Sequence, residues 1–197
     1  VKIFVNNRTG QPFIWPKSVI LMDITRDNLQ LMKTSKGNDI ASLSADRPVL
    51  LVFLRHFGCI FCRESLHDIS RKWTNFQESG VTPVFVHMAD DVTARQFFKK
   101  FGVADAEHIS DPDCRYYRLF GLVKGSFSQL FGLKTWLRGA EVAATKGIFP
   151  AAPGLGDGLQ MPGIFLIRNG EVIRSFIHHS VADKPDYDSF IATCRIN

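Results

Sequence analysis

The sequence has few cysteines, no long apolar run and no block of like charge, and each absence excludes a class of protein. Four cysteines among 197 residues are too few for a disulfide-stapled scaffold, so we expect a reducing, cytoplasmic compartment. No stretch reaches the roughly 20 apolar residues of a membrane-spanning helix, and no secretory signal is visible, so we expect no membrane partner. The cations are scattered and the formal net charge is only +5, which does not favour nucleic-acid binding.

What the chain does contain is typical of one globular domain. Hydrophobic residues make up 45% of it and charged residues 22%, which is ordinary for a folded protein in water. Its length allows one well-buried domain rather than two. The 17 phenylalanines occur in several apolar segments, which predicts a core filled by aromatic rings.

The most informative feature is a pair of cysteines, Cys59 and Cys62, at the end of an apolar run. Residues 48–54 predict a strand buried on both faces, and apolar residues return at helical spacing after the pair. A C-x-x-C at such a turn places two thiols at the positive end of a helix, where the thiolate is favoured over the thiol. Arg55 and Arg63 are the nearby cations that we expect to stabilise the thiolate. The pattern indicates reversible thiol–disulfide chemistry.

Two other interpretations of the cysteine pair stay open. Half of a zinc site needs two further ligands, but neither His178–His179 nor the single Cys114 and Cys194 has the usual spacing. The pair could also be buried and inert, as free cysteines often are. Either lone cysteine could act as a distant resolving thiol, although an isolated cysteine is the simpler interpretation. We favour redox chemistry, with no metal and no bound cofactor.

Three more features bear on the motif. Pro162 precedes a predicted strand, and we expect it to form a cis peptide bond with its ring facing the redox turn; the alternative is a trans proline that starts an edge strand. His56 could tune the thiol, but a half-exposed loop position is the simpler interpretation. We expect the apolar residues of 127–137 to pack over the sheet edge rather than to contact a membrane or a hydrophobic substrate.

The order of the predicted elements indicates the fold class. Strands are predicted at 48–54, 83–88 and 108–110, helices at 59–78, after Asp90 and after Asp111–Pro112, a hairpin of 163–168 and 171–176 around Asn169–Gly170, and a last helix at 187–194. This is the order of an α/β, thioredoxin-like fold. We expect a central mixed sheet, parallel in its first strands and antiparallel at its end, with helices on both faces.

Two segments depart from this simple order. Residues 1–35 are predicted to be an N-terminal extension, with short strand signals at 2–5 and 19–24, and residues 36–197 to be the thioredoxin-like domain. An edge strand is expected at 40–43. Residues 121–150 interrupt the alternation of strands and helices, and we expect them to form a helical insert.

The segment around the cysteines resembles a known family. The sequence LVFLRHFGCIFCRE at 51–64 is similar to the active-site segment of peroxiredoxin-like proteins in the alkyl hydroperoxide reductase/thiol-specific antioxidant superfamily, in the branch that carries C-x-x-C. Residues 110–121 and 156–160 resemble the second and third landmarks of that family. The similarity covers about residues 36–192, and it implies a thioredoxin-like fold and an antioxidant thiol enzyme.

The resemblance leaves open which thiol attacks. Peroxiredoxins carry P-x-x-x-T-x-x-C, and this pattern places the peroxide-attacking cysteine at Cys62, the threonine at Cys59 and the proline at Arg55. Cys62 would then become a sulfenic acid, and Cys59 would condense with it. In the thioredoxin frame, by contrast, Cys59 attacks and Cys62 resolves.

The sequence thus predicts a thiol redox enzyme that reduces hydroperoxides through a reversible Cys59–Cys62 couple. Its expected partners are a peroxide or disulfide substrate and an external thiol reductant, such as a thioredoxin or glutathione system, and a homodimer is also allowed. One alternative is a thiol–disulfide oxidoreductase acting on protein disulfides. The other is a thioredoxin-fold binding module that uses the aromatic insert as its interface.

Overall fold

The structure, a computed structural model, describes residues 4–5, 12–13, 24–151 and 156–195. Its centre is a five-stranded sheet in the order β5-β4-β3-β6-β7, formed by β3 (Val49–Phe53), β4 (Thr82–His87), β5 (Glu107–Ser110), β6 (Gly163–Arg168) and β7 (Glu171–Ile177). The first three strands run parallel, and β6 is antiparallel to both β3 and β7. The expected mixed sheet is therefore confirmed.

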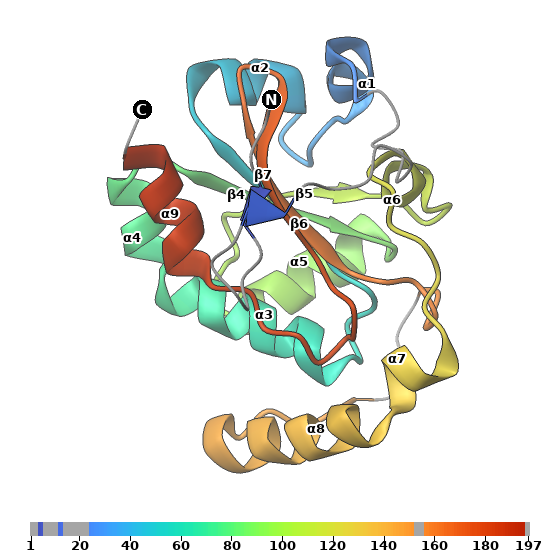
Figure 1. The fold of residues 1–197 in the computed structure, drawn as a ribbon. Coiled ribbons are helices and arrows are strands. Elements are labelled where there is room, and N and C mark those ends of the chain that lie inside the picture. The colour runs from blue at the N-terminus through green and yellow to red at the C-terminus, as the bar shows by residue number, and fades with distance from the viewer. Residues whose placement is uncertain (1–3, 6–11, 14–23, 152–155, 196–197) are drawn as a thin grey trace.

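Strand β3 lies in the middle of the sheet, and its alternating side chains divide the core in two. Leu50 and Val52 face α3 (Ile60–Arg71), α4 (Trp73–Glu78), α5 (Asp91–Lys100) and α9 (Tyr187–Arg195). Val49, Leu51 and Phe53 face α1 (Arg26–Leu31), α2 (Ile40–Asp46) and α6 (Arg115–Leu119). Helices thus cover both faces of the sheet (Figure 1), as the uninterrupted apolar run of β3 predicts.

Two of the predicted elements differ from the structure. The edge strand expected at 40–43 is wrong: these residues begin helix α2, because the Asp39 side chain accepts a hydrogen bond from the Ser42 N–H and caps the helix. The single helix expected at 59–78 is divided at Lys72 into α3 and α4. The Asn169–Gly170 turn is confirmed, with positive φ at both residues.

The N-terminal segment is described only in part. Strands β1 (Phe4–Val5) and β2 (Pro12–Phe13) pair with each other, which agrees with the strand signal at 2–5. Most of the strand signal at 19–24 lies outside the described residues. Helix α1 places Leu29 in the core beside the sheet. The boundary between an extension and a domain at residue 35 stays a prediction.

The insert is helical, as expected, but most of the large apolar residues of 127–137 are exposed. It consists of α7 (Phe127–Phe131) and α8 (Leu133–Lys146), and α8 lies outside α3, away from the sheet (Figure 1). Leu130 is buried, whereas Phe127, Trp136 and Leu137 are exposed. The expectation that residues 127–137 pack over the sheet edge is therefore wrong. Among the described helices, none is long and apolar enough to cross a membrane.

Candidate active site at the turn between β3 and α3

The two cysteines lie where the central strand passes into a helix. Residues 54–58 form the connecting loop, Cys59 is the N-cap of α3, and Cys62 lies in the first helical turn. No side chain caps this helix end, so its free N–H groups and its dipole act on the sulfur atoms. Both cysteines are buried free thiols. The Tyr117 hydroxyl donates hydrogen bonds to the carbonyls of Leu54 and Val86. These bonds fix the start of the loop against the sheet.

Arg55 is the side chain that organises the turn. Its backbone N–H donates to Cys62 Sγ at 3.2 Å, and its Nη1 donates to Cys59 Sγ at 3.4 Å. The same guanidinium donates through Nε to the Gln160 carbonyl at 3.0 Å and through Nη2 to the Gly158 carbonyl. Arg55 is itself buried, so its positive charge acts on the sulfur atoms with little screening by water.

These contacts divide the two thiols into a strong and a weak acid. The hydrogen bond from the Cys62 thiol and the positive charge of Arg55 lower the pKa of Cys59 to about 5, although burial opposes the shift. Because Cys62 supplies that hydrogen bond and is fully buried, its own pKa is raised well above the usual value. The pair is therefore suited to hold one thiolate and one thiol at neutral pH.

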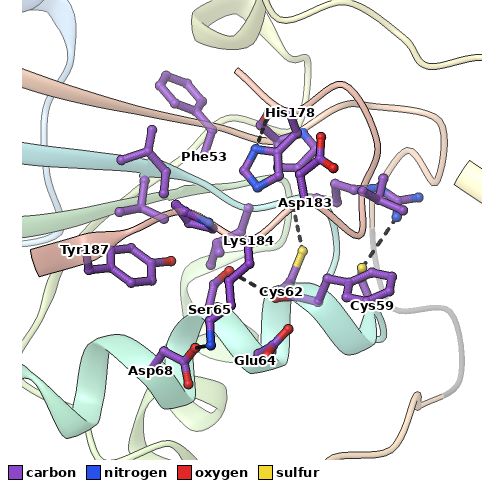
Figure 2. Close-up of a pocket in the computed structure, with 18 residues that line it drawn as sticks. Phe53, Cys59, Cys62, Glu64, Ser65, Asp68, His178, Asp183, Lys184 and Tyr187 are labelled. Carbon is purple, nitrogen blue, oxygen red and sulfur yellow. Dashed lines mark hydrogen bonds and ion pairs between the residues drawn. The ribbon is translucent and has the colours of Figure 1, made fainter. Parts of the chain in front are cut away.

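A narrow cavity of about 20 Å³ opens beside the two sulfur atoms, which is room for roughly one water-sized molecule. Figure 2 shows both sulfur atoms at the start of α3, with His178 on the opposite side of the pocket. His178 is buried, and its Nδ1 is 3.2 Å from the Pro162 carbonyl. Burial lowers the pKa of His178 to about 4, so the ring is neutral at physiological pH.

The other predicted residues fall into place around this pocket. Pro162 lines it together with the cysteines, but the expected cis bond is wrong. The described residues contain no cis peptide bond, so Met161–Pro162 is trans, the isomer that is intrinsically more stable. Pro162 also precedes β6, an interior strand, rather than an edge strand. His56 is half-buried, and burial lowers its pKa.

Arg63 lies against two aromatic rings. Its guanidinium lies 5.7 Å from the ring centre of Phe97 and 5.6 Å from that of Phe101, both on the side of α5. This is a cation–π arrangement. The expected help of Arg63 in stabilising a thiolate stays a prediction, whereas Arg55 makes direct contacts with both cysteines.

Several site residues carry little or no sequence signal. Gln160 belongs to a segment that resembles a family landmark, but nothing in its sequence shows that its carbonyl accepts from Arg55. Glu64 follows the motif by two residues, and its buried carboxylate pairs with Arg138 at 2.6 Å and Lys146 at 2.9 Å, both on α8. His178 is recognisable as one of two adjacent histidines, yet only the structure separates it from His179.

The remaining cysteines lie apart from this arrangement. The Cys114 thiol is 3.2 Å from the Met88 sulfur, and the Cys194 thiol donates to a carbonyl within α9.

Among the described residues, the group that could hold a metal ion consists of His87, Asp91 and His108, and includes neither Cys59 nor Cys62. Its two imidazoles hydrogen-bond to each other at 2.9 Å, and burial lowers the pKa of His87 to about 3.

The fold and the cysteine turn together define a thiol redox protein, and comparisons give its family. The family model of the AhpC/TSA family matches residues 23–176, so the chain belongs to the AhpC/TSA family. It is a peroxiredoxin-like oxidoreductase with a thioredoxin-like fold.

Individual relatives agree with this placement. The chain is 26% identical over 187 residues to a prostamide/prostaglandin F synthase of Danio rerio, covering 91% of this chain and 90% of that one. It is 26% identical over 144 residues to peroxiredoxin-like 2C of Bos taurus, covering 70% and 62%. The solved structure of peroxiredoxin Q from Xanthomonas campestris superposes with a TM-score of 0.58 at 18% identity, covering 84% of this chain and 89% of that chain.

Proposed function

We propose that the protein reduces hydroperoxides through a reversible Cys59–Cys62 couple in which Cys59 attacks first. The observation that carries the proposal is the contact of the Arg55 guanidinium with Cys59 Sγ at 3.4 Å. The cation stabilises the thiolate, and the thiolate is the nucleophile in this chemistry. The proposed order of attack is therefore that of thioredoxins, in which the first cysteine of the pair attacks. The proposed substrate class is that of peroxiredoxins.

The cycle balances without a metal or a bound cofactor. The Cys59 thiolate attacks one peroxide oxygen, the O–O bond breaks, and an alcohol or water leaves after taking up a proton, so that Cys59 becomes a sulfenic acid. The Cys62 thiol then attacks the Cys59 sulfur, and water leaves as the disulfide forms. Two electrons and two protons, from one external dithiol or from two monothiols, restore the pair. We propose a thioredoxin or glutathione system in the cytoplasm as that reductant.

The burial of the nucleophile favours a small oxidant. Cys59 is 7% exposed, and the cavity beside it holds roughly one water-sized molecule. A peroxide group can reach the sulfur through such an opening, whereas a folded protein disulfide would need the turn to open. For this reason a thiol–disulfide oxidoreductase is our second candidate function. It would use the same Cys59 thiolate. A binding module without thiol chemistry ranks third.

The test uses single and double cysteine variants with one equivalent of hydrogen peroxide. For the wild type we expect an intact mass lower by two hydrogen atoms and no intermolecular disulfide. Cys62→Ser should accumulate a dimedone-reactive sulfenic acid at Cys59, and Cys59→Ser should be nearly inert. If Cys59→Ser instead accumulates the sulfenic acid at Cys62, the order of attack is reversed.

The same variants separate the three functions. If peroxide is consumed no faster by the wild type than by Cys59→Ser/Cys62→Ser, the peroxidase proposal fails. Reduction of insulin disulfides by the wild type in that case would identify the oxidoreductase. Inertness of the pair to both oxidants would leave the binding module.

We also propose that the protein is a homodimer.

A further inference from the structure

Helix α8 turns two charged side chains inward beside the buried Val142, and it turns its large apolar side chains outward. Toward α3 it presents Arg138 and Lys146, which form ion pairs with the buried Glu64. On the opposite side, Leu133, Trp136 and Leu137 are all more than 60% exposed. A helix that packs only on its own domain normally has the reverse orientation. An exposed apolar side of this kind is typical of an interaction surface.

The exposed large apolar residues of α7 and α8, two helices that contact each other, are here called the outer patch. It consists of Phe127, Phe131, Leu133, Trp136 and Leu137, which are 78%, 48%, 76%, 71% and 65% exposed. The rings of Phe127 and Phe131 lie 5.1 Å apart. Because an aromatic side chain can bury about 150–250 Å², three aromatic rings and two leucines exposed to this extent offer several hundred Å² of apolar surface. Together with neighbouring atoms, this approaches the roughly 800 Å² per partner of a stable protein interface.

The charges around the outer patch argue against an anionic partner. Lys134 on α8 is paired with Asp183 at 2.9 Å, and Lys124 before α7 is paired with Asp157 at 2.7 Å. Arg138 and Lys146 point toward Glu64. Attraction to an anionic lipid surface or a nucleic acid requires cations that are free to face it. A patch of aromatic and aliphatic residues whose neighbouring cations are already neutralised is typical of the centre of a protein interface.

The outer side of α8 is complementary to itself. Its apolar residues are Leu133, Leu137, Ala140 and Ala144 with Trp136 beside them, and all are exposed, at the three- and four-residue spacing of a helix-pairing seam. The large residues occupy the first half of the helix and the small ones the second half. If two copies of α8 pair antiparallel about a two-fold axis, Leu133 faces Ala144 of the other copy, and Leu137 faces Ala140. In a parallel pair of α8 helices, by contrast, the large side chains of one copy would face the large side chains of the other.

We propose that the outer patch binds the outer patch of a second copy, with the two α8 helices antiparallel. This is an isologous interface, in which the same surface serves both protomers and closes the assembly at two. The inference deepens the homodimer proposed above, and it does not depend on the order of attack by the thiols.

The first experiment tests whether the patch forms the dimer. Sedimentation velocity under reducing conditions should show a dimer for the wild type and a monomer for Trp136→Glu/Leu137→Glu. Val92→Glu, which places a single glutamate at an exposed apolar residue on α5, should remain a dimer. A monomeric wild type would overturn both the homodimer and its interface. If the double variant stays a dimer, the homodimer stands and this interface is overturned.

The second experiment tests the antiparallel arrangement. Leu133→Ala leaves a gap opposite Ala144, and Ala144→Leu forces two leucines together, so each should weaken the dimer by about tenfold or more. The combined variant Leu133→Ala/Ala144→Leu exchanges large and small and should recover most of the affinity. If the combined variant instead loses as much dimer affinity as the two single variants together, the antiparallel pairing is overturned. Binding of a monomeric wild type to uncharged phosphatidylcholine vesicles would assign the patch to lipid and overturn the proposal.

Discussion

The Nη1 of Arg55 lies 3.4 Å from the sulfur of Cys59, inside a turn from which water is largely excluded. The same arginine is tied through Nε to the Gln160 carbonyl, so its position does not depend on the cysteine. A fixed, buried cation beside a sulfur atom favours the thiolate without rearrangement when the proton leaves.

Replacing Arg55 should make Cys59 a weaker acid. For Arg55→Gln we expect the pKa of Cys59 to rise by about one unit or more, because the neighbouring positive charge is lost. Arg63→Gln removes the other predicted cation and should raise that pKa much less, since its guanidinium lies over Phe97 and Phe101. The pH dependence of thiolate absorbance in a Cys114→Ser/Cys194→Ser background measures both. Equal shifts in the two variants would contradict the assignment.

The reactivity of Cys59 should depend on pH with a midpoint near 5. Its pKa is lowered to about 5, so the thiolate is present at neutral pH and is lost as the pH falls through that value. Alkylation by iodoacetamide, followed by peptide mass spectrometry, should level off above about pH 6. Cys62, whose pKa is raised, should stay unmodified over the same range. A midpoint near the roughly 8.5 of a free cysteine would show that the turn does not stabilise the thiolate.

The local parts of the site could be predicted from the sequence, because short-range patterns determine them. The apolar run of β3 and the helical spacing after Cys62 place the thiols at a strand-to-helix turn, and Asn169–Gly170 specifies the hairpin through its positive φ values. The partners of Arg55 could not be predicted. It bonds to the backbone carbonyls of Gly158 and Gln160, and a carbonyl acceptor leaves no mark in the sequence.

The orientation of α8 shows the limit of periodicity. The spacing of apolar residues indicates that this helix has an apolar side, but not which way that side faces. Here the inner side of α8 carries the buried Val142 and the ion pairs of Arg138 and Lys146 with Glu64 and Asp68 on α3, which are more than seventy residues away in the chain. The cis bond expected at Pro162 is also wrong, because a proline before a strand does not by itself specify its isomer, and trans is intrinsically the more stable one.

The buried carboxylate of Glu64 should contribute to stability. Glu64→Gln leaves Arg138 and Lys146 without their shared partner, and we expect the free energy of unfolding to fall by about 2 kcal/mol. Glu141→Gln is the control. Glu141 is exposed, and its ion pair with Arg138 is longer, at 3.7 Å, so its loss should cost under about 0.5 kcal/mol. Urea unfolding measures both. Similar values for the two variants would mean that Glu64 is screened by water.

The hydroxyl of Tyr117 should hold the loop that carries Arg55. It donates to the carbonyls of Leu54 and Val86 at the ends of two adjacent strands, and it is fully buried. Tyr117→Phe removes these bonds and leaves buried carbonyl oxygen atoms less satisfied, so we expect the free energy of unfolding to fall by about 1–2 kcal/mol and peroxide-driven disulfide formation to slow. The neighbouring Tyr116→Phe loses an exposed hydroxyl contact with the Leu31 carbonyl and should change stability by less than about 0.5 kcal/mol. Urea unfolding and stopped-flow oxidation test the pair. If Tyr117→Phe loses stability while its oxidation rate is unchanged, the hydroxyl supports the core but not the position of the redox loop.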